Sequence, residues 1–193
     1  MAKSKIILLD SDVISHFMST AKIDILPKIL SPHHLFIVAD VYRESIHHPL
    51  FENRKQELDN WIARHNIQKI DFPWNNDNIK LEFYRIKKES PQLGAGERAC
   101  LAIARYEKDV IASSNFHDVA DYCEQYSIEH IGVMDILTIA VRRDIFTVDD
   151  CNKFIHDAIV INDAKFPVAR FEEYSSARNL DEFCSKPSVN PVL

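Results

Sequence analysis

Short apolar runs alternate with longer segments of helical periodicity along this chain. Apolar runs that suit buried strands occur at residues 6–9, 35–38, 110–112 and 131–133, with a half-buried, alternating run at 67–72. Apolar residues recur at helical spacing in residues 53–65, 77–89, 95–107 and 116–126. Because parallel strands need a crossover that is usually a helix, this alternation predicts an α/β layer fold with a largely parallel sheet.

The composition agrees with an α/β protein outside membranes. Only 3 of the 193 residues are glycine, which favours helices and short connections over a glycine-turned all-β fold. The chain has no run of 18 apolar residues and no recognisable secretory signal, so we expect a cytoplasmic protein without a membrane span. The cysteines have neither zinc-ribbon nor thioredoxin spacing, and we expect free thiols, with Cys100 buried in a helix.

The first acidic pair follows directly on the first strand. Asp10 and Asp12 lie where the apolar run 6–9 gives way to a helical pattern. In parallel sheets, ligands bind at the carboxyl ends of strands. Asp12 alone is also explained as an ordinary helix N-cap. Asp10 is harder to explain structurally, because a charge beside a buried strand is costly unless it is paired or bound to a metal.

Two further carboxylates occupy comparable positions. Glu44 follows the second strand, and Glu97 follows Gly94 and Gly96, which permit close backbone approach. Each glutamate alone is equally well explained as a favourable first-turn charge. Together, Asp10, Glu44 and Glu97 could converge on one hard cation. Magnesium and manganese prefer such oxygen ligands and retain waters for hydrolysis, which is the chemistry of a metal-dependent nuclease.

Three motifs in this chain resemble those of a known protein family. The segments Ile-Ile-Leu-Leu-Asp-Ser-Asp-Val-Ile-Ser, Val-Tyr-Arg-Glu and Leu-Gly-Ala-Gly-Glu-Arg-Ala-Cys-Leu-Ala-Ile-Ala occur in this order. Over residues 5–145 the chain resembles PIN-domain proteins, which include the VapC-type toxins of toxin–antitoxin pairs. The resemblance implies a Rossmann-like α/β/α sandwich and Mg²⁺- or Mn²⁺-dependent cleavage of single-stranded RNA. It assigns metal binding to Asp10, Glu44 and Glu97 and an accessory polar role to Asp12.

The fourth motif departs from the family pattern. After the strand 110–112 the family usually places one or two aspartates, whereas this chain has Ser-Ser-Asn-Phe-His-Asp at 113–118. Asn115 offers a neutral amide oxygen to a metal. Asp118 lies one helical turn further on, where it either reaches back to the site as a metal ligand or faces solvent. A site with one charge fewer should bind a metal more weakly or need the substrate phosphate to complete it.

These observations lead to a domain and function hypothesis. We expect a PIN-like nuclease domain at residues 1–145, and a C-terminal helical extension and tail at 146–193 that pack on it. The chain would be an endoribonuclease and the toxin of a toxin–antitoxin pair, with an antitoxin protein and a homodimer as the partners that the resemblance implies. The alternatives are a catalytically impaired RNA- or protein-binding module, which the net charge of -6 favours, and a phosphatase.

A few other residues carry structural expectations. Asp135 is expected to be the N-cap of the helix that follows the last strand. Trp61 lies on an apolar helical stripe and is expected in the core. Arg43 and Arg98 flank the acidic residues, where they would pair with a neighbouring acid or line the rim. The adjacent histidines do not share a helical face, so we expect surface positions for His33, His34, His47 and His48.

Overall fold

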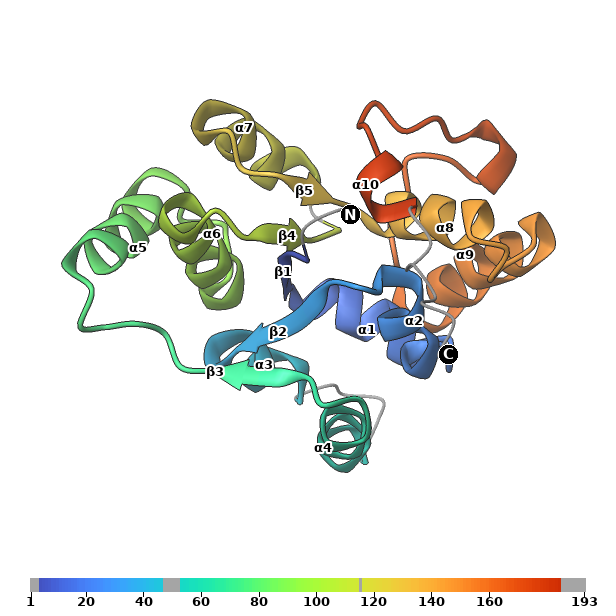
Figure 1. The fold of residues 1–193 in the computed structure, drawn as a ribbon, viewed down its shortest axis with the longest axis horizontal. Coiled ribbons are helices and arrows are strands. Elements are labelled where there is room, and N and C mark those ends of the chain that lie inside the picture. Colours follow the sequence, from blue (N-terminus) through green and yellow to red (C-terminus); the bar gives the residue numbers. More distant parts are fainter. Residues whose placement is uncertain (1–3, 47–52, 115, 185–193) are drawn as a thin grey trace, which may run out of the picture.

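A five-stranded, fully parallel sheet forms the centre of the protein (Figure 1). The computed structural model describes residues 4–46, 53–114 and 116–184. The strand order is β3-β2-β1-β4-β5. The strands are β1 (Ile6–Leu9), β2 (His34–Val38), β3 (Gln68–Ile70), β4 (Val110–Ala112) and β5 (His130–Ile131). The predicted α/β class and parallel sheet are therefore confirmed, although β3 and β5 are shorter than the runs at 67–72 and 131–133 suggest.

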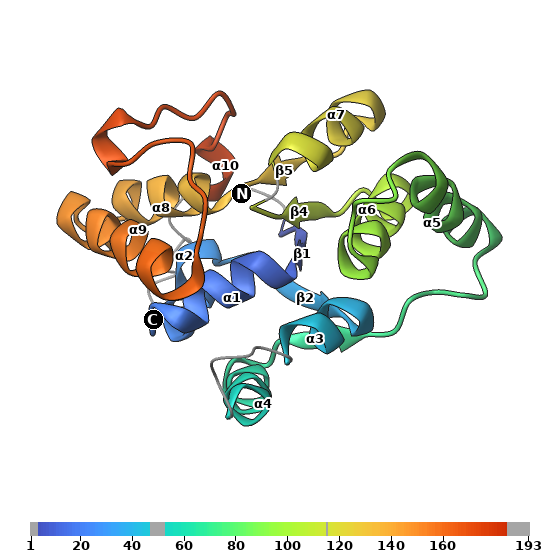
Figure 2. The same cartoon turned by 180° about the vertical axis from the view of Figure 1, so that it is seen from behind.

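Helices cover both faces of this sheet. Helices α5, α6 and α7 lie on one side, and α1, α2, α8 and α9 lie on the other (Figures 1 and 2). The helices are α1 (Ser11–Ser19), α2 (Leu26–Leu30), α3 (Ala39–Ser45), α4 (Arg54–His65), α5 (Asp77–Glu89), α6 (Ala95–Glu107), α7 (Phe116–Tyr126), α8 (Val133–Arg142), α9 (Val148–Asn162) and α10 (Asp181–Cys184), with short 3-10 turns at Ile23–Ile25 and Phe171–Glu173. No helix in these described ranges is both long and apolar enough to span a membrane.

The direction in which the chain adds strands to the sheet reverses at the β1–β4 pair. From β1 the chain passes to β2 on one side, whereas β4 pairs with the other side of β1. Helices that follow strands on opposite sides of such a point diverge, which opens a space at the carboxyl ends of the two strands. Asp10 follows β1 directly and Ser113 follows β4 directly. The first acidic residue is therefore placed at the position where parallel sheets bind ligands.

One continuous apolar core includes the C-terminal segment. Phe154 of α9 packs against Phe17 of α1, with ring centroids 4.8 Å apart. Phe183 of α10 is also fully buried and contacts the ring of His33. Residues 146–184 therefore complete the cover of the sheet instead of forming a separate globule.

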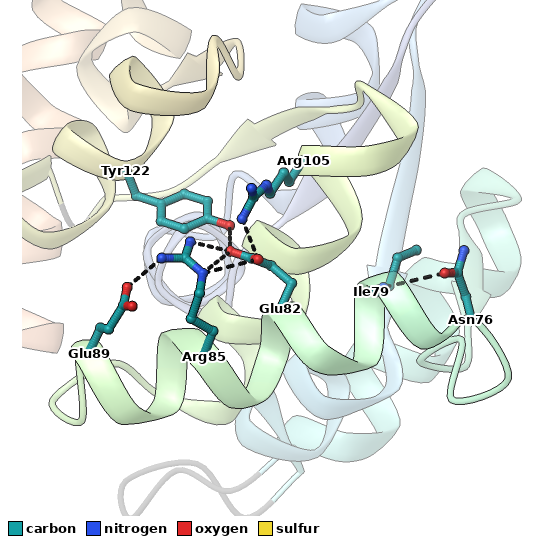
Figure 3. Close-up of polar contacts among 7 residues, drawn as sticks. All are labelled: Asn76, Ile79, Glu82, Arg85, Glu89, Arg105 and Tyr122. Atoms are coloured by element: carbon teal, nitrogen blue, oxygen red, sulfur yellow. Dashed lines mark hydrogen bonds and ion pairs between the residues drawn. The ribbon is translucent and has the colours of Figure 1, made fainter.

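A buried carboxylate joins the three helices on the other face. Glu82 of α5 is 4% exposed and accepts hydrogen bonds from Arg85 and from Tyr122 of α7, and it pairs with Arg105 of α6 (Figure 3). The Arg105 guanidinium also lies over the ring of Tyr126, 3.8 Å from its centroid. Because α7 begins shortly after the end of β4, this cluster fixes the helix that follows β4.

Several local expectations need correction. The N-cap of α8 is Gly132, and Asp135 lies at the third helical position, where its Oδ2 accepts from the Gly132 amide at 2.9 Å. His33 is buried, because its Nδ1 accepts from the Lys5 amide and its ring packs on Phe183, whereas His34 is exposed as expected. Trp61 is buried as predicted. His47 and His48 lie outside the described residues.

Candidate metal-binding acidic site

Asp10 is a buried carboxylate at the end of β1. It is 1% exposed, and its Oδ1 accepts from the Ser11 amide at 2.7 Å, which makes it the N-cap of α1. Its Oδ2 accepts from the Ser113 hydroxyl at 2.9 Å. Burial and the nearby carboxylates of Glu97 and Asp12 raise the pKa of Asp10 to about 8, against the two hydrogen bonds. The cap role that the sequence suggests for Asp12 therefore belongs to Asp10.

Glu44 and Glu97 meet at the N-terminus of α6. The Gly96 amide donates to Glu44 Oε1 at 3.0 Å, and the Gly94 amide donates to Glu97 Oε2 at 2.9 Å. A methyl group on Gly96 would lie 2.6 Å from Glu44 Oε2, so glycine allows this approach. The tight turn before α6 thus brings the second and third predicted carboxylates together.

Cys100 shows that these carboxylates surround one region. Its thiol is buried, and burial raises its pKa well above the usual range. The negative charges of Asp10, Glu44 and Glu97 act in the same direction. The three predicted metal ligands therefore lie around the first turns of α6, and within the described residues Asp10 and Glu44 form no ion pair with a basic side chain.

The flanking arginines do not neutralise this site directly. Arg43 pairs with Asp40 on the same helix, with Nη2 and Oδ1 2.6 Å apart. Arg98 donates to the backbone carbonyl of Leu93 and lies over the ring of Phe83. Of the two expectations for these residues, pairing with a neighbouring acid applies to Arg43, and Arg98 instead supports the turn that precedes α6.

The fit to a divalent cation is good in donor chemistry but incomplete in arrangement. Three clustered carboxyl groups offer the oxygen ligands that Mg²⁺ and Mn²⁺ prefer. In the described part of the chain, however, no group of three or more His, Cys, Asp or Glu side chains is placed to hold a metal ion. Asp10, Glu44 and Glu97 each accept hydrogen bonds from protein donors. A cation would therefore share the carboxylates of Glu44 and Glu97 with the amides of Gly96 and Gly94.

The fourth motif is described only in part. Asn115 lies outside the described residues, and Asp118 belongs to α7 but its side chain is not described. Among the described residues of this motif, Ser113 reaches the site through its hydrogen bond to Asp10. Sequence reasoning did not single out Ser113. Its position directly after a buried strand, equivalent to that of Asp10 after β1, was the available signal.

A cavity beside Asp12 adds residues that the sequence did not indicate. It has a volume of about 440 Å³ and is lined by Asp12, His16, Ser114, Asn162 and Lys165, among others. His16 is 6% exposed, its Nδ1 lies 2.9 Å from Asn162 Nδ2, and burial lowers its pKa. Asn162 is the last residue of α9, so the C-terminal extension forms one wall of this cavity.

Comparison with known proteins gives no independent assignment. No protein-family model matches the chain, and a search of curated proteins gives no significant match.

Proposed function

We propose that this protein is a metal-dependent endoribonuclease of the PIN type. The observation that supports this most is the buried Asp10 carboxylate at the β1–β4 switch point, close to the carboxylates of Glu97 and Asp12. Isolated buried carboxylates are costly, and accumulation of like charge at a ligand-binding crevice is typical of functional sites. The motif order described above supports the same assignment.

In the proposed reaction, the carboxylates hold the cation and position it against the RNA backbone. A bound Mg²⁺ or Mn²⁺ would activate a water for in-line attack on the phosphodiester and stabilise the leaving oxygen. Asp10 and Glu97 would be ligands, and Glu44 would bind directly or through a water. The Ser113 hydroxyl orients Asp10 through its hydrogen bond. Asn115 or Asp118 would complete the ligand set.

Cleavage of single-stranded RNA in the presence of Mn²⁺ or Mg²⁺ tests this proposal. We expect Asp10→Asn to lower the rate by about 100-fold or more, because asparagine keeps the cap and the shape but removes the charge. Asp149→Asn is the matched control, since Asp149 is an exposed residue in the first turn of α9. An Asp10→Asn protein that cuts as fast as the parent, or a parent that leaves RNA intact with every divalent cation, would rule the nuclease out.

One observation favours the alternative of a non-catalytic binding module. Glu44 and Glu97 accept hydrogen bonds from the amides of Gly96 and Gly94 at the start of α6, which is a structural role. Calorimetric titration with Mn²⁺ separates the two functions. The nuclease proposal expects heat of binding that is lost in Asp10→Asn, whereas no heat from Mn²⁺ or Mg²⁺ would favour the binding module. An antitoxin partner and a homodimer stay predictions of the sequence resemblance.

A further inference from the structure

A second cavity adjoins the one beside Asp12 and differs from it in character. It has a volume of about 400 Å³ and is lined mainly by residues of the C-terminal extension. Apolar and aromatic side chains line it together with two basic side chains. The lining residues that matter for the argument are Ser114, Lys165, Phe166, Pro167, Tyr174 and Arg178.

The two cavities share a boundary next to the acidic site. Ser114 and Lys165 line both of them. Ser114 directly follows Ser113, whose hydroxyl donates to Asp10. The apolar cavity therefore includes Ser114, whose neighbour Ser113 contacts Asp10, the carboxylate that would hold the catalytic metal.

The walls of the apolar cavity are held in place by a buried acid. Asp135 of α8 is fully buried, and its Oδ1 accepts from the Tyr174 hydroxyl at 2.7 Å and from the Ser176 hydroxyl at 2.5 Å. Its Oδ2 accepts from Arg178 Nη1 at 3.2 Å. The segment between α9 and α10, which runs beside α8 in Figures 1 and 2, is thus fixed by its own side chains. A wall fixed before binding loses little entropy when a ligand enters.

The polar groups at the boundary suit a phosphate. Lys165 is exposed and forms no ion pair within the described residues. The Ser114 hydroxyl oxygen is buried and has no hydrogen-bond partner among the residues that the structure describes. A cation and a hydroxyl donor beside an apolar slot match the chemistry of a nucleotide, with its charged phosphate and its flat base.

We propose that the cavity between Phe166, Pro167 and Tyr174 binds an unpaired base of the RNA, and that Lys165 and Ser114 bind the adjoining phosphate. The proposal rests on the ribonuclease function and names the part of the substrate next to the cleaved bond. Unpaired bases are recognised by stacking on aromatic and apolar side chains, which a base inside a duplex cannot reach. The C-terminal extension would therefore direct the enzyme to single-stranded RNA.

Titration with nucleoside 5′-monophosphates in EDTA tests this pocket without any metal. We expect weak binding of at least one monophosphate, seen by calorimetry or by amide chemical shifts, and markedly weaker binding of inorganic phosphate. Lys165→Gln should weaken binding by about fivefold through loss of the charge. Ala177→Trp should weaken it by about tenfold or more, because the new side chain would fill the cavity from an exposed position.

Matched controls come from residues outside the cavity. Lys87→Gln removes an exposed lysine on α5, and Tyr84→Ala removes an exposed aromatic ring on the same helix. Neither should alter binding. The pocket proposal fails if no monophosphate binds, or if Lys165→Gln and Ala177→Trp bind as the parent does. Failure of the nuclease function gives a different result, because binding in EDTA would then persist in a protein that cleaves no RNA with any cation.

Discussion

At Gly96 the backbone of α6 lies close to α3. A methyl group added there would lie 2.8 Å from Val41 Cγ2 and 2.6 Å from Glu44 Oε2, closer than van der Waals contact permits. A methyl group on Gly94 would approach Glu44 no closer than 3.3 Å. Glycine is therefore required more strictly at position 96 than at position 94, although both glycines precede Glu97 and look alike in the sequence.

Alanine substitution at these two positions gives a matched pair. We expect Gly96→Ala to lower the free energy of unfolding by about 1–3 kcal/mol, since α6 must move away from α3. Gly94→Ala should cost clearly less, because its contacts relax with a small shift of the Glu44 side chain. Urea unfolding of both variants measures the difference. Equal destabilisation of the two variants would show that the packing of α6 against α3 does not require glycine at position 96.

Asp10 should make the stability of the metal-free protein fall as the pH rises. Its pKa is about 8 in the folded protein, against about 4 in an unfolded chain, so the folded state keeps a proton that the unfolded state releases. Between these values the free energy of unfolding should therefore decrease with pH, by up to about 1.4 kcal/mol per unit. Asp10→Asn should remove this contribution.

Urea unfolding in EDTA at several pH values from 5 to 8 checks the expectation. The slope of stability against pH should be smaller in Asp10→Asn than in the parent, while Asp149→Asn, at an exposed position, should keep the parental slope. Identical slopes in all three proteins would mean that the Asp10 carboxylate is ionised throughout this range.

The positions of the site residues could be predicted further than their orientations. Asp10, Glu44 and Glu97 were expected near one another because each lies at a strand exit or a helix start, and ligands bind at that edge of a parallel sheet. The partners of these carboxylates could not be predicted, since they depend on contacts between distant segments. Asp10 and Ser113 are 103 residues apart, and Glu44 and Gly96 are 52 residues apart. Local periodicity contains no information about such pairs.

At the scale of elements, strong periodicity gave the right boundaries. Helices α5, α6 and α7 have the ranges that their apolar spacing predicts, because each presents one apolar face to the sheet or its neighbour. The short helix α2, with Pro27 near its start, was not predicted, since 5 residues are too few to show a period. Strand β5 covers only His130–Ile131, because Gly132 already caps α8.

The ion-pair cluster around Glu82 predicts how the stability of the packed helices depends on acidic pH. Burial disfavours ionisation of Glu82, but hydrogen bonds from Arg85, Arg105 and Tyr122 outweigh it and lower the pKa to about 2. An unfolded glutamate has a pKa of about 4.3. The stabilisation is thus fully present above that value and is lost as the pH falls toward 2.

We expect Glu82→Gln to lower the free energy of unfolding by about 3 kcal/mol at pH 7, because two arginines lose a shared carboxylate. At pH 3 the difference from the parent should shrink to roughly half. Glu89→Gln on the same helix is the control, since Glu89 is an exposed partner of Arg85 and should matter little. A difference that stays constant between the two pH values would contradict the assigned pKa.

For the molecule as a whole, the question is whether residues 146–184 fold with the sheet or apart from it. Phe154 is 1% exposed and packs on Phe17, so Phe154→Ala should cost about 3–5 kcal/mol. Both tryptophans, Trp61 and Trp74, lie outside this segment and report on the rest of the protein through their fluorescence. If the core is one cooperative unit, Phe154→Ala should shift the unfolding midpoint that the tryptophans report.

The exposed neighbour Val160 supplies the control for this test. It is 68% exposed on the same helix, so Val160→Ala should leave the midpoint near that of the parent. A separately folding extension would behave differently, because Phe154→Ala would then cause early loss of helical circular dichroism with no change in tryptophan fluorescence. A single shifted transition seen by both probes would instead show that the extension and the sheet fold together. The same coupling would fix the position of the wall of the proposed base-binding cavity relative to Asp10.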